Sequence, residues 1–132
     1  MNIIVTGGAG FIGSALIREA VNSGSFNVLN IDKLTYAANQ DSLSSIAESS
    51  NYTFKQADIC DAISLRSIFN DFKPEAIMHL AAESHVDRSI DHPVEFIKTN
   101  ILGTFHILEE SKRYYESLSE NVRKGFKFHH IS

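Results

Sequence analysis

The sequence contains little cysteine and no long apolar run. Cys60 has no second cysteine with which to form an internal disulfide, so we expect a reducing, cytoplasmic setting. No stretch approaches the roughly 18 consecutive apolar residues that a membrane-spanning helix needs. The opening residues MNIIV are too short for the apolar core of a secretion signal, and no basic segment precedes them. We therefore expect neither a disulfide scaffold nor a membrane protein.

Charge of one sign is not concentrated anywhere in the chain. The 12 basic and 16 acidic side chains give a net charge of −4 and are spread along the sequence. Basic residues near the end are interleaved with acids and predict a solvated face, with no nucleic-acid or membrane surface. Repeats and low-complexity linkers are also absent. With 132 residues, 43% of them hydrophobic, we expect one domain over 1–132.

Short apolar runs alternate with amphipathic segments along the whole chain. The apolar run at the start is typical of a strand buried on both faces. Strands that alternate with helices predict an α/β fold, namely a Rossmann-type doubly wound parallel sheet of five strands in the order 3-2-1-4-5. The chain stops at the fifth strand, so we expect an unpaired edge there, with marginal stability or self-association. Strands are expected at 2–6, 26–32, 52–58, 75–82 and 125–132, and helices at 11–24, 41–47, 61–72 and 91–115.

Three of these helices carry more detailed expectations. Asp61 is an N-cap candidate for the helix at 61–72, and Pro93 falls in the first turn of the helix at 91–115. Apolar residues at helical spacing predict the buried sides of the first and third helices. These are Ile12, Leu16, Ala20 and Val21 in the first, and Ile63, Ile68, Phe69 and Phe72 in the third.

The turn between the first strand and the first helix is rich in glycine. Gly7, Gly10 and Gly13 have the spacing G-x-x-G-x-x-G, a variant of the dinucleotide-binding fingerprint. One glycine permits a tight turn, another lets the backbone approach a pyrophosphate, and Gly13 allows close packing of helix on strand. The helix N-terminus offers N–H groups and partial positive charge to phosphates. The alternative is a tight turn without a ligand.

Acidic residues follow the second and third expected strands. Asp32 lies 19 positions after Gly13, close to the spacing of a ribose-binding carboxylate, and it would repel a 2′-phosphate, which favours NAD over NADP. The neighbouring Lys33 acts in the opposite direction. Asp58 and Ile59 are expected near the adenine, although Asp58 is also a possible helix cap. For Asp61 we prefer the capping role.

Small and polar residues follow the fourth strand in the segment LAAESHVDRS, residues 80–89. The alanines let the backbone run alongside a cofactor, and the polar residues after them point into the crevice beyond the strand ends. An acid–base site formed by Glu83, His85 and Asp87 is the alternative to a crevice wall, which we prefer because no nucleophile or metal spacing accompanies them. His79 is expected to be a core histidine.

The blocks TGGAGFIGS, DKLTYAANQDSL, ADICD, HLAAESHVDRSI and TNILGT occur in this order and cover most of the chain. With them the sequence resembles the extended short-chain dehydrogenase/reductase superfamily and, within it, the dTDP-glucose 4,6-dehydratase family. The first block is common to sugar-nucleotide epimerases and dehydratases. The pair DKLTYA and AAESHVDRSI is more specific to the dehydratases.

The resemblance implies a set of NAD contacts and two substrate contacts. Ser84 and His85 would touch the sugar nucleotide dTDP-glucose, and Asn100 would be mainly structural. A homodimer through the helix at 91–115 is implied for the whole protein. The implied NAD contacts are Gly7, Gly10, Phe11, Ile12, Gly13, Asp32, Lys33, Leu34, Thr35, Asp58, Ile59, Leu80, Ala81, Ala82, Glu83, Ser84 and Thr99.

The family reaction implies catalytic groups that this sequence does not supply. A hydride leaves the fourth carbon of the sugar, water is eliminated from the fifth and sixth carbons, and the hydride returns to the sixth. The family uses a Tyr-x-x-x-Lys pair and a Thr-Asp-Glu run, but no tyrosine here has a lysine four residues on, and the sequence ends at Ser132, one residue before that run. We therefore expect no catalytic residue, no metal site, weak NAD binding and no turnover in this chain. The alternatives are another sugar-nucleotide enzyme of the superfamily, an epimerase or decarboxylase, or a non-catalytic dinucleotide-binding module.

Overall fold

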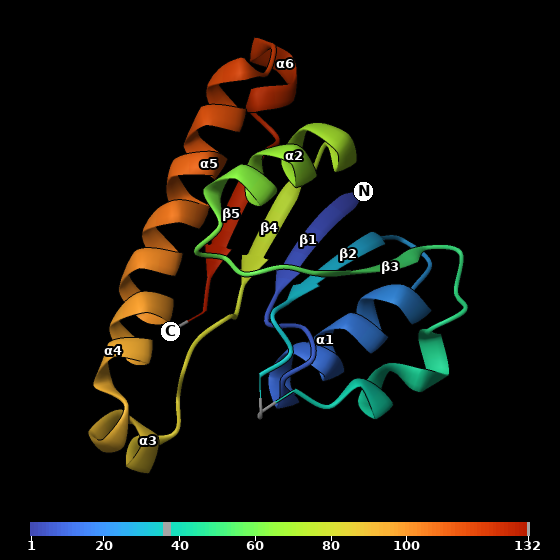
Figure 1. Cartoon of the computed structure of the whole chain (residues 1–132). Helices are drawn as coiled ribbons and strands as arrows, with labels where there is room; N and C mark the ends of the chain where they lie inside the picture. The colour runs from blue at the N-terminus through green and yellow to red at the C-terminus, as the bar shows by residue number, and fades with distance from the viewer. Residues whose placement is uncertain (36–37, 132) are drawn as a thin grey trace.

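The computed structural model describes residues 1–35 and 38–131, and Ser132, the last residue of the expected fifth strand, lies outside them. Strands and helices alternate along the chain (Figure 1). The strands are β1 (Asn2–Thr6), β2 (Asn27–Asp32), β3 (Tyr52–Gln56), β4 (Ala76–His79) and β5 (Lys127–His130). The helices are α1 (Phe11–Asn22), the 3₁₀-helix η1 (Gln40–Ile46), α2 (Ala62–Phe72), α3 (Val86–Asp91), α4 (Pro93–Phe96), the π-helix η2 (Ile97–Gly103), α5 (Thr104–Ser117) and α6 (Glu120–Arg123).

The five strands form one parallel sheet in the order β3-β2-β1-β4-β5, which confirms the predicted fold class and strand order. In the central strand, Ile4 lies opposite Leu29 of β2 and Ile77 of β4. The order reverses at β1, from which the chain runs outward first on one side and later on the other. This reversal places a crevice between β1 and β4 at the carboxyl ends of the strands.

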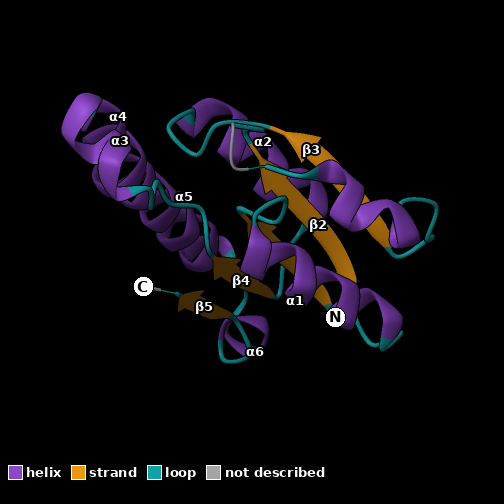
Figure 2. Ribbon diagram, turned by 90° about the horizontal axis from the view of Figure 1, so that it is seen from below, coloured by secondary structure: helices purple, strands orange, loops and turns teal. Residues whose placement is uncertain are grey.

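Helices cover both faces of the sheet (Figure 2). Alternate residues of β1 point to opposite sides, so that Ile3 and Val5 pack against α1 and η1, whereas Ile4 packs against α2 and α5. These three residues of β1 illustrate why a central strand is a continuous apolar run, since both of its faces are buried. The edge strands β3 and β5 are more exposed.

Two helices bury the expected face apart from one isoleucine in each, because Ala20 and Val21 in α1 and Ile68 and Phe69 in α2 are buried. Ile63 is 84% exposed and Leu65 is buried in its place, while Ile12 is 64% exposed and Ile17 faces the sheet. In both helices the misassigned isoleucine lies in the first turn. Asp61 is the N-cap, as predicted, with its carboxylate accepting from the amides of residues 63 and 64.

The expected helix at 91–115 is confirmed as one continuous helical rod over 93–117, in which α4, η2 and α5 follow one another without a break. We call this rod, together with α3 before it, the helical column. Pro93 is in the first turn of α4, as expected. His92, with a φ of −132°, separates α4 from the preceding helix α3. The π-helix η2 follows and widens the helix before α5 begins. A Cβ atom on Gly103 would lie 2.6 Å from the Cδ1 atom of Ile59, so the helix backbone packs directly on the β3–α2 loop.

A buried histidine links the sheet to α5. His79 is fully buried; its Nδ1 atom is 2.7 Å from the Thr6 hydroxyl and its Nε2 atom is 3.1 Å from the Thr104 hydroxyl. The Thr6 hydroxyl oxygen also accepts from the Ala81 amide at 3.3 Å, so both ring nitrogens of His79 and the loop after β4 belong to one hydrogen-bond network. Burial, helped by the nearby His130 ring, lowers the pKa of His79 to about 4.

This network predicts that stability is lost as the pH falls from about 6.5 to about 4. Below pH 6.5 the unfolded chain protonates His79 while the folded chain does not, so the unfolded state binds more protons. The full effect of this shift is about 3 kcal/mol of unfolding free energy. Urea denaturation at neutral pH and at about pH 4.5 measures the change.

A His79→Gln variant should be less stable at neutral pH and lose less stability on acidification. His129→Gln is the matched control, because His129 is an exposed histidine in β5, the strand next to β4. Parallel losses in the parent and His79→Gln would contradict the assignment.

Candidate functional site

A cavity of about 470 Å³ opens at the carboxyl end of the sheet. The loops that follow β1, β2 and β4 meet there, below the arrowheads in Figure 1. The π-helix η2 closes one side and the start of α1 another. The lining residues are Gly7, Gly10, Phe11, Ile12, Gly13, Ile31, Asp32, Lys33, Thr35, Ala38, Ala57, Asp58, Ile59, Leu80, Ala81, Ala82, Glu83, Ser84, Thr99 and Ile131.

The glycine loop between β1 and α1 is packed too closely for side chains. Gly7 has a φ of +73°, and a Cβ atom there would lie 2.7 Å from the Ala81 backbone. A Cβ atom on Gly13 would overlap the Gly7 carbonyl oxygen and lie 2.8 Å from the Cα atom of Gly8. The loop therefore lies directly against the segment after β4 and under the first turn of α1.

The first turn of α1 faces the cavity without a side-chain cap. Gly10 is the N-cap residue, has extended backbone angles and makes no side-chain cap hydrogen bond, and no acidic residue occupies the first turn. Phe11 is 94% exposed beside the cavity. An uncapped helix N-terminus presents N–H groups and partial positive charge, which suits an anionic group such as a phosphate.

Asp32 ties the glycine loop to the end of β2. One carboxylate oxygen accepts from the Ala9 amide at 2.9 Å, and the other accepts from the Leu34 amide at 2.8 Å. The second bond closes a turn in which Leu34 has a φ of +60°. Each oxygen retains a further acceptor position, so the carboxylate is held in place and can still accept from a hydroxyl in the cavity.

Lys33 and Asp58 form an ion pair between the ends of β2 and β3, with 2.8 Å between Nζ and Oδ2. The hydrogen bond to Asp58 raises the pKa of Lys33. Burial acts to raise the pKa of Asp58, but hydrogen bonds from Lys33 and from the Cys60 amide outweigh it and lower that pKa. Cys60 itself, with a thiol pKa raised by burial and by the Asp58 charge, is not an activated nucleophile.

The loop after β4 is fixed on two sides. On one side, the Ala81 amide donates a hydrogen bond to the Thr6 hydroxyl. The Asn100 side chain accepts from the Glu83 amide and donates to the Glu83 carbonyl, each at 2.8 Å. Asn100 lies in the π-helix η2, so it has the structural role expected from the sequence. Its neighbour Thr99 lines the cavity.

The structure brings together nearly all the residues that the sequence analysis named as cofactor contacts. Leu34 is the exception: it is absent from the lining, and its amide donates to Asp32 in the positive-φ turn. Of the two substrate candidates, Ser84 lines the cavity, whereas His85 is the N-cap residue of α3 and does not. Asp87 is also outside the lining, so the alternative cluster with Glu83 and His85 does not converge on the cavity.

Four lining residues were not predicted: Ile31, Ala38, Ala57 and Ile131. Ile31 and Ala57 directly precede predicted contacts at strand ends, so the sequence could have indicated that they line the cavity. Nothing in the sequence indicated this for Ala38, since it lies in a polar connection. Among the residues that the structure describes, no group of three or more histidine, cysteine, aspartate or glutamate side chains is placed to hold a metal ion. Over the same residues, no helix is long and apolar enough to span a membrane.

Comparisons with known proteins agree with this geometry. The chain is 55% identical over its 132 residues to a dTDP-glucose 4,6-dehydratase of Escherichia coli, and 54% identical to that of Haemophilus influenzae. It covers 36% and 39% of these two proteins, so it spans little more than a third of their length.

Solved structures with the same fold carry bound ligands. A dTDP-glucose 4,6-dehydratase from Bacillus anthracis in complex with NAD matches the whole chain with a TM-score of 0.83 at 32% identity, over 37% of its own length. A second, from Streptomyces venezuelae with NAD and TYD bound, matches 86% of the chain and 36% of its own length, with a TM-score of 0.81 at 38% identity.

A family model described as GDP-mannose 4,6 dehydratase matches residues 4–132, which is nearly the whole chain. The match includes the glycine loop, both acidic strand ends and the segment after β4. By this match the chain belongs to the GDP-mannose 4,6 dehydratase family.

Proposed function

We propose that this chain is the NAD-binding portion of a cytoplasmic dTDP-glucose 4,6-dehydratase, the enzyme that converts dTDP-glucose to dTDP-4-keto-6-deoxyglucose and water. One observation carries the proposal. The cavity joins the glycine loop, Asp32, Asp58 and the segment after β4, which are the separate sequence blocks shared with that family. The relatives of that name, two of which have bound NAD, support the same assignment.

The lining residues fit a dinucleotide from one end to the other. The uncapped first turn of α1 binds the pyrophosphate, and Asp32 accepts from the adenosine ribose. Asp58 and Ile59 lie at the adenine end, and Ala81 and Ala82 form the wall of the nicotinamide end. NAD, when bound, supplies the hydride acceptor for the sugar.

The substrate side of the cavity is formed by Ser84, next to Glu83, at the end of the loop that Asn100 holds. Ser84 binds the sugar nucleotide in this proposal, and His85 follows at the start of α3. The catalytic tyrosine–lysine pair and acid–base pair belong to the remainder of the whole protein. This chain alone binds NAD weakly and turns nothing over.

Two other functions remain as outcomes of a test. A UDP-glucose 4-epimerase from Thermotoga maritima matches 86% of the chain with a TM-score of 0.76 at 36% identity, so an epimerase has a similar framework. The block AAESHVDRSI favours the dehydratase. A non-catalytic dinucleotide-binding module is the alternative from a different class.

A chimera tests the activity. Residues 1–132 are fused to the remainder of the Escherichia coli relative and supplied with dTDP-glucose, UDP-glucose or GDP-mannose. We expect dTDP-glucose alone to lose the mass of one water, as detected by mass spectrometry, and the unfused chain to leave all three unchanged. Epimerised UDP-glucose would support the epimerase, and an inactive but NAD-binding chimera would support the binding module.

Glycine substitutions test the cofactor site. In Gly13→Ala the new Cβ displaces the Gly7 carbonyl, at a cost of about 1–3 kcal/mol, or roughly ten- to a hundredfold in NADH affinity. Gly125→Ala is the matched control, because its Cβ meets the Val122 carbonyl at an ordinary 3.6 Å. Calorimetric titration measures the affinity, and thermal melting checks that both variants fold. Equal affinities would contradict the proposed site.

We also propose that the whole protein is a homodimer through the helical column. Apolar side chains repeat along η2 and α5 at helical spacing and stay exposed: Ile97 at 52%, Ile101 at 61% and Phe105 at 54%. Leu108 continues the same stripe. A contiguous exposed apolar stripe of this kind marks a protein–protein contact surface.

Charge reversal on the stripe tests the dimer. We expect the chain to sediment as a dimer and Ile101→Glu to sediment as a monomer, because an unpaired carboxylate in an apolar interface is costly. Ile63→Glu is the control, since Ile63 is an exposed isoleucine on α2, outside the stripe. Dissociation by both variants, or by neither, would place the interface elsewhere.

A further inference from the structure

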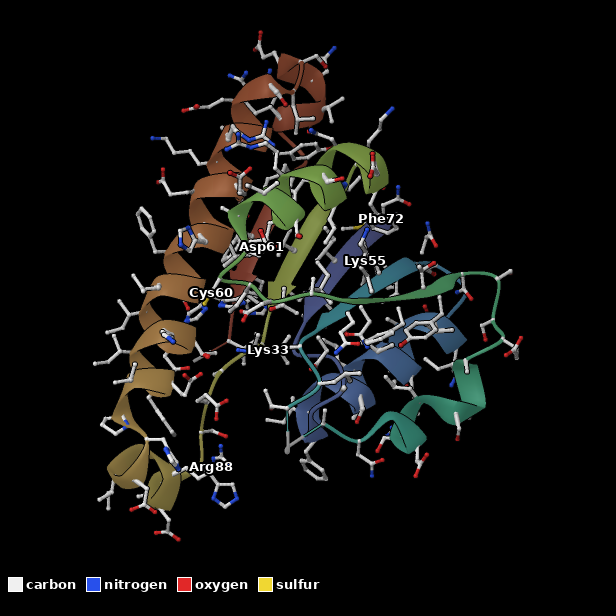
Figure 3. The ribbon with its side chains drawn as sticks, viewed as in Figure 1. Lys33, Lys55, Cys60, Asp61, Phe72 and Arg88 are labelled. Carbon is white, nitrogen blue, oxygen red and sulfur yellow. The ribbon has the colours of Figure 1, made fainter. Side chains whose placement is uncertain are left out.

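The ion pair between Lys33 and Asp58 occupies the cavity rim next to Asp32. Lys33 directly follows Asp32 at the end of β2, and Asp58 follows β3, the neighbouring strand. Figure 3 shows Lys33 at the carboxyl ends of the strands, with Cys60 on the side toward the helical column. The lysine adjacent to the ribose carboxylate is therefore engaged by a carboxylate from the next strand.

The backbone on both sides of this pair is fixed. Asp58 accepts from the Cys60 amide at 2.9 Å through its other oxygen, in a local turn that anchors the carboxylate. The Lys33 carbonyl accepts from the Gln56 side chain at 3.3 Å, and Leu34 is locked in its positive-φ turn by Asp32. The Lys33 side chain, in contrast to this backbone, can rotate toward a different anionic partner.

The charges of the pair hold it together at neutral pH. The pKa of Lys33 is raised and that of Asp58 is lowered, so both remain ionised across that range. The Lys33 side chain is 48% exposed, which leaves it able to reach another anion if Asp58 releases it. The Asp58 contact therefore sets the direction of the ammonium group.

This direction matters for the choice of cofactor. NADP differs from NAD by a phosphate on the adenosine ribose, and a cation beside the ribose carboxylate is the feature that accommodates it. Resting on the proposed function, we infer that Asp58 is a specificity-determining residue, which excludes NADP by holding Lys33 away from the 2′-phosphate position. Asp32 repels the phosphate directly, and Asp58 removes the adjacent Lys33 cation that would offset this repulsion.

An Asp58→Asn variant tests the inference. Asparagine keeps an oxygen for the Cys60 amide but releases Lys33. Calorimetric titration of the full chain with NADH and NADPH gives the ratio of their affinities, in which any common effect at the adenine cancels. We expect the ratio to shift about fivefold toward NADPH, the scale of an exposed ion pair, with a smaller shift at high salt.

Three further variants show whether Lys33 carries the effect. The gain should vanish in Lys33→Met/Asp58→Asn, and Lys33→Met alone should not shift the ratio toward NADPH. Asp71→Asn, at an exposed site in α2 outside the cavity, controls for loss of a negative charge. An unchanged ratio in Asp58→Asn, a gain that persists in the double variant, or a gain in Lys33→Met would each overturn the inference alone. Absence of saturable NADH binding by the parent chain would instead overturn the proposed function and this inference with it.

Discussion

The contact between the glycine loop and the segment after β4 is the constraint on which the site depends. Gly7 lies against the Ala81 backbone so closely that no Cβ atom fits, and Gly13 lies equally close to the loop on its other side. These contacts bring α1 down to the sheet at the reversal of strand order. They thereby create an uncapped helix N-terminus at the mouth of the crevice.

Hydrogen bonds on both sides of β1 hold the glycine loop against the segment after β4. On the β2 side, Asp32 accepts from the Ala9 amide and so tethers the loop. On the β4 side, the Thr6 hydroxyl bonds both His79 and the Ala81 amide, and His79 continues the chain of bonds to Thr104 in α5. Buried polar groups that are satisfied in this way specify one arrangement of the backbone, because any displacement leaves a donor or acceptor unpaired.

The helical column contributes to the molecule on two sides. Its inner side holds the cavity, where Asn100 bonds both backbone groups of Glu83 and Gly103 packs on Ile59. Its outer side carries the apolar stripe that we assign to the dimer. A π-helix at this position is in keeping with the frequent occurrence of such segments at functional sites.

The sequence by itself determined the fold class, the strand order, the glycine loop and the cap at Asp61, because these follow from short-range periodicity and from backbone chemistry within a few residues. The resemblance of its motifs to those of a known family also implied nearly every residue of the cavity wall, and the parallel strands bring most of these residues to one edge of the sheet. Only the tertiary structure decided that Ile12 and Ile63 are exposed, that Leu34 lies outside the cavity lining, and that the long helix contains a π-helical segment. Only the tertiary structure likewise paired Lys33 with Asp58. Each of these features depends on a neighbour supplied by another element, or on the lack of one, and local sequence carries no information about such neighbours.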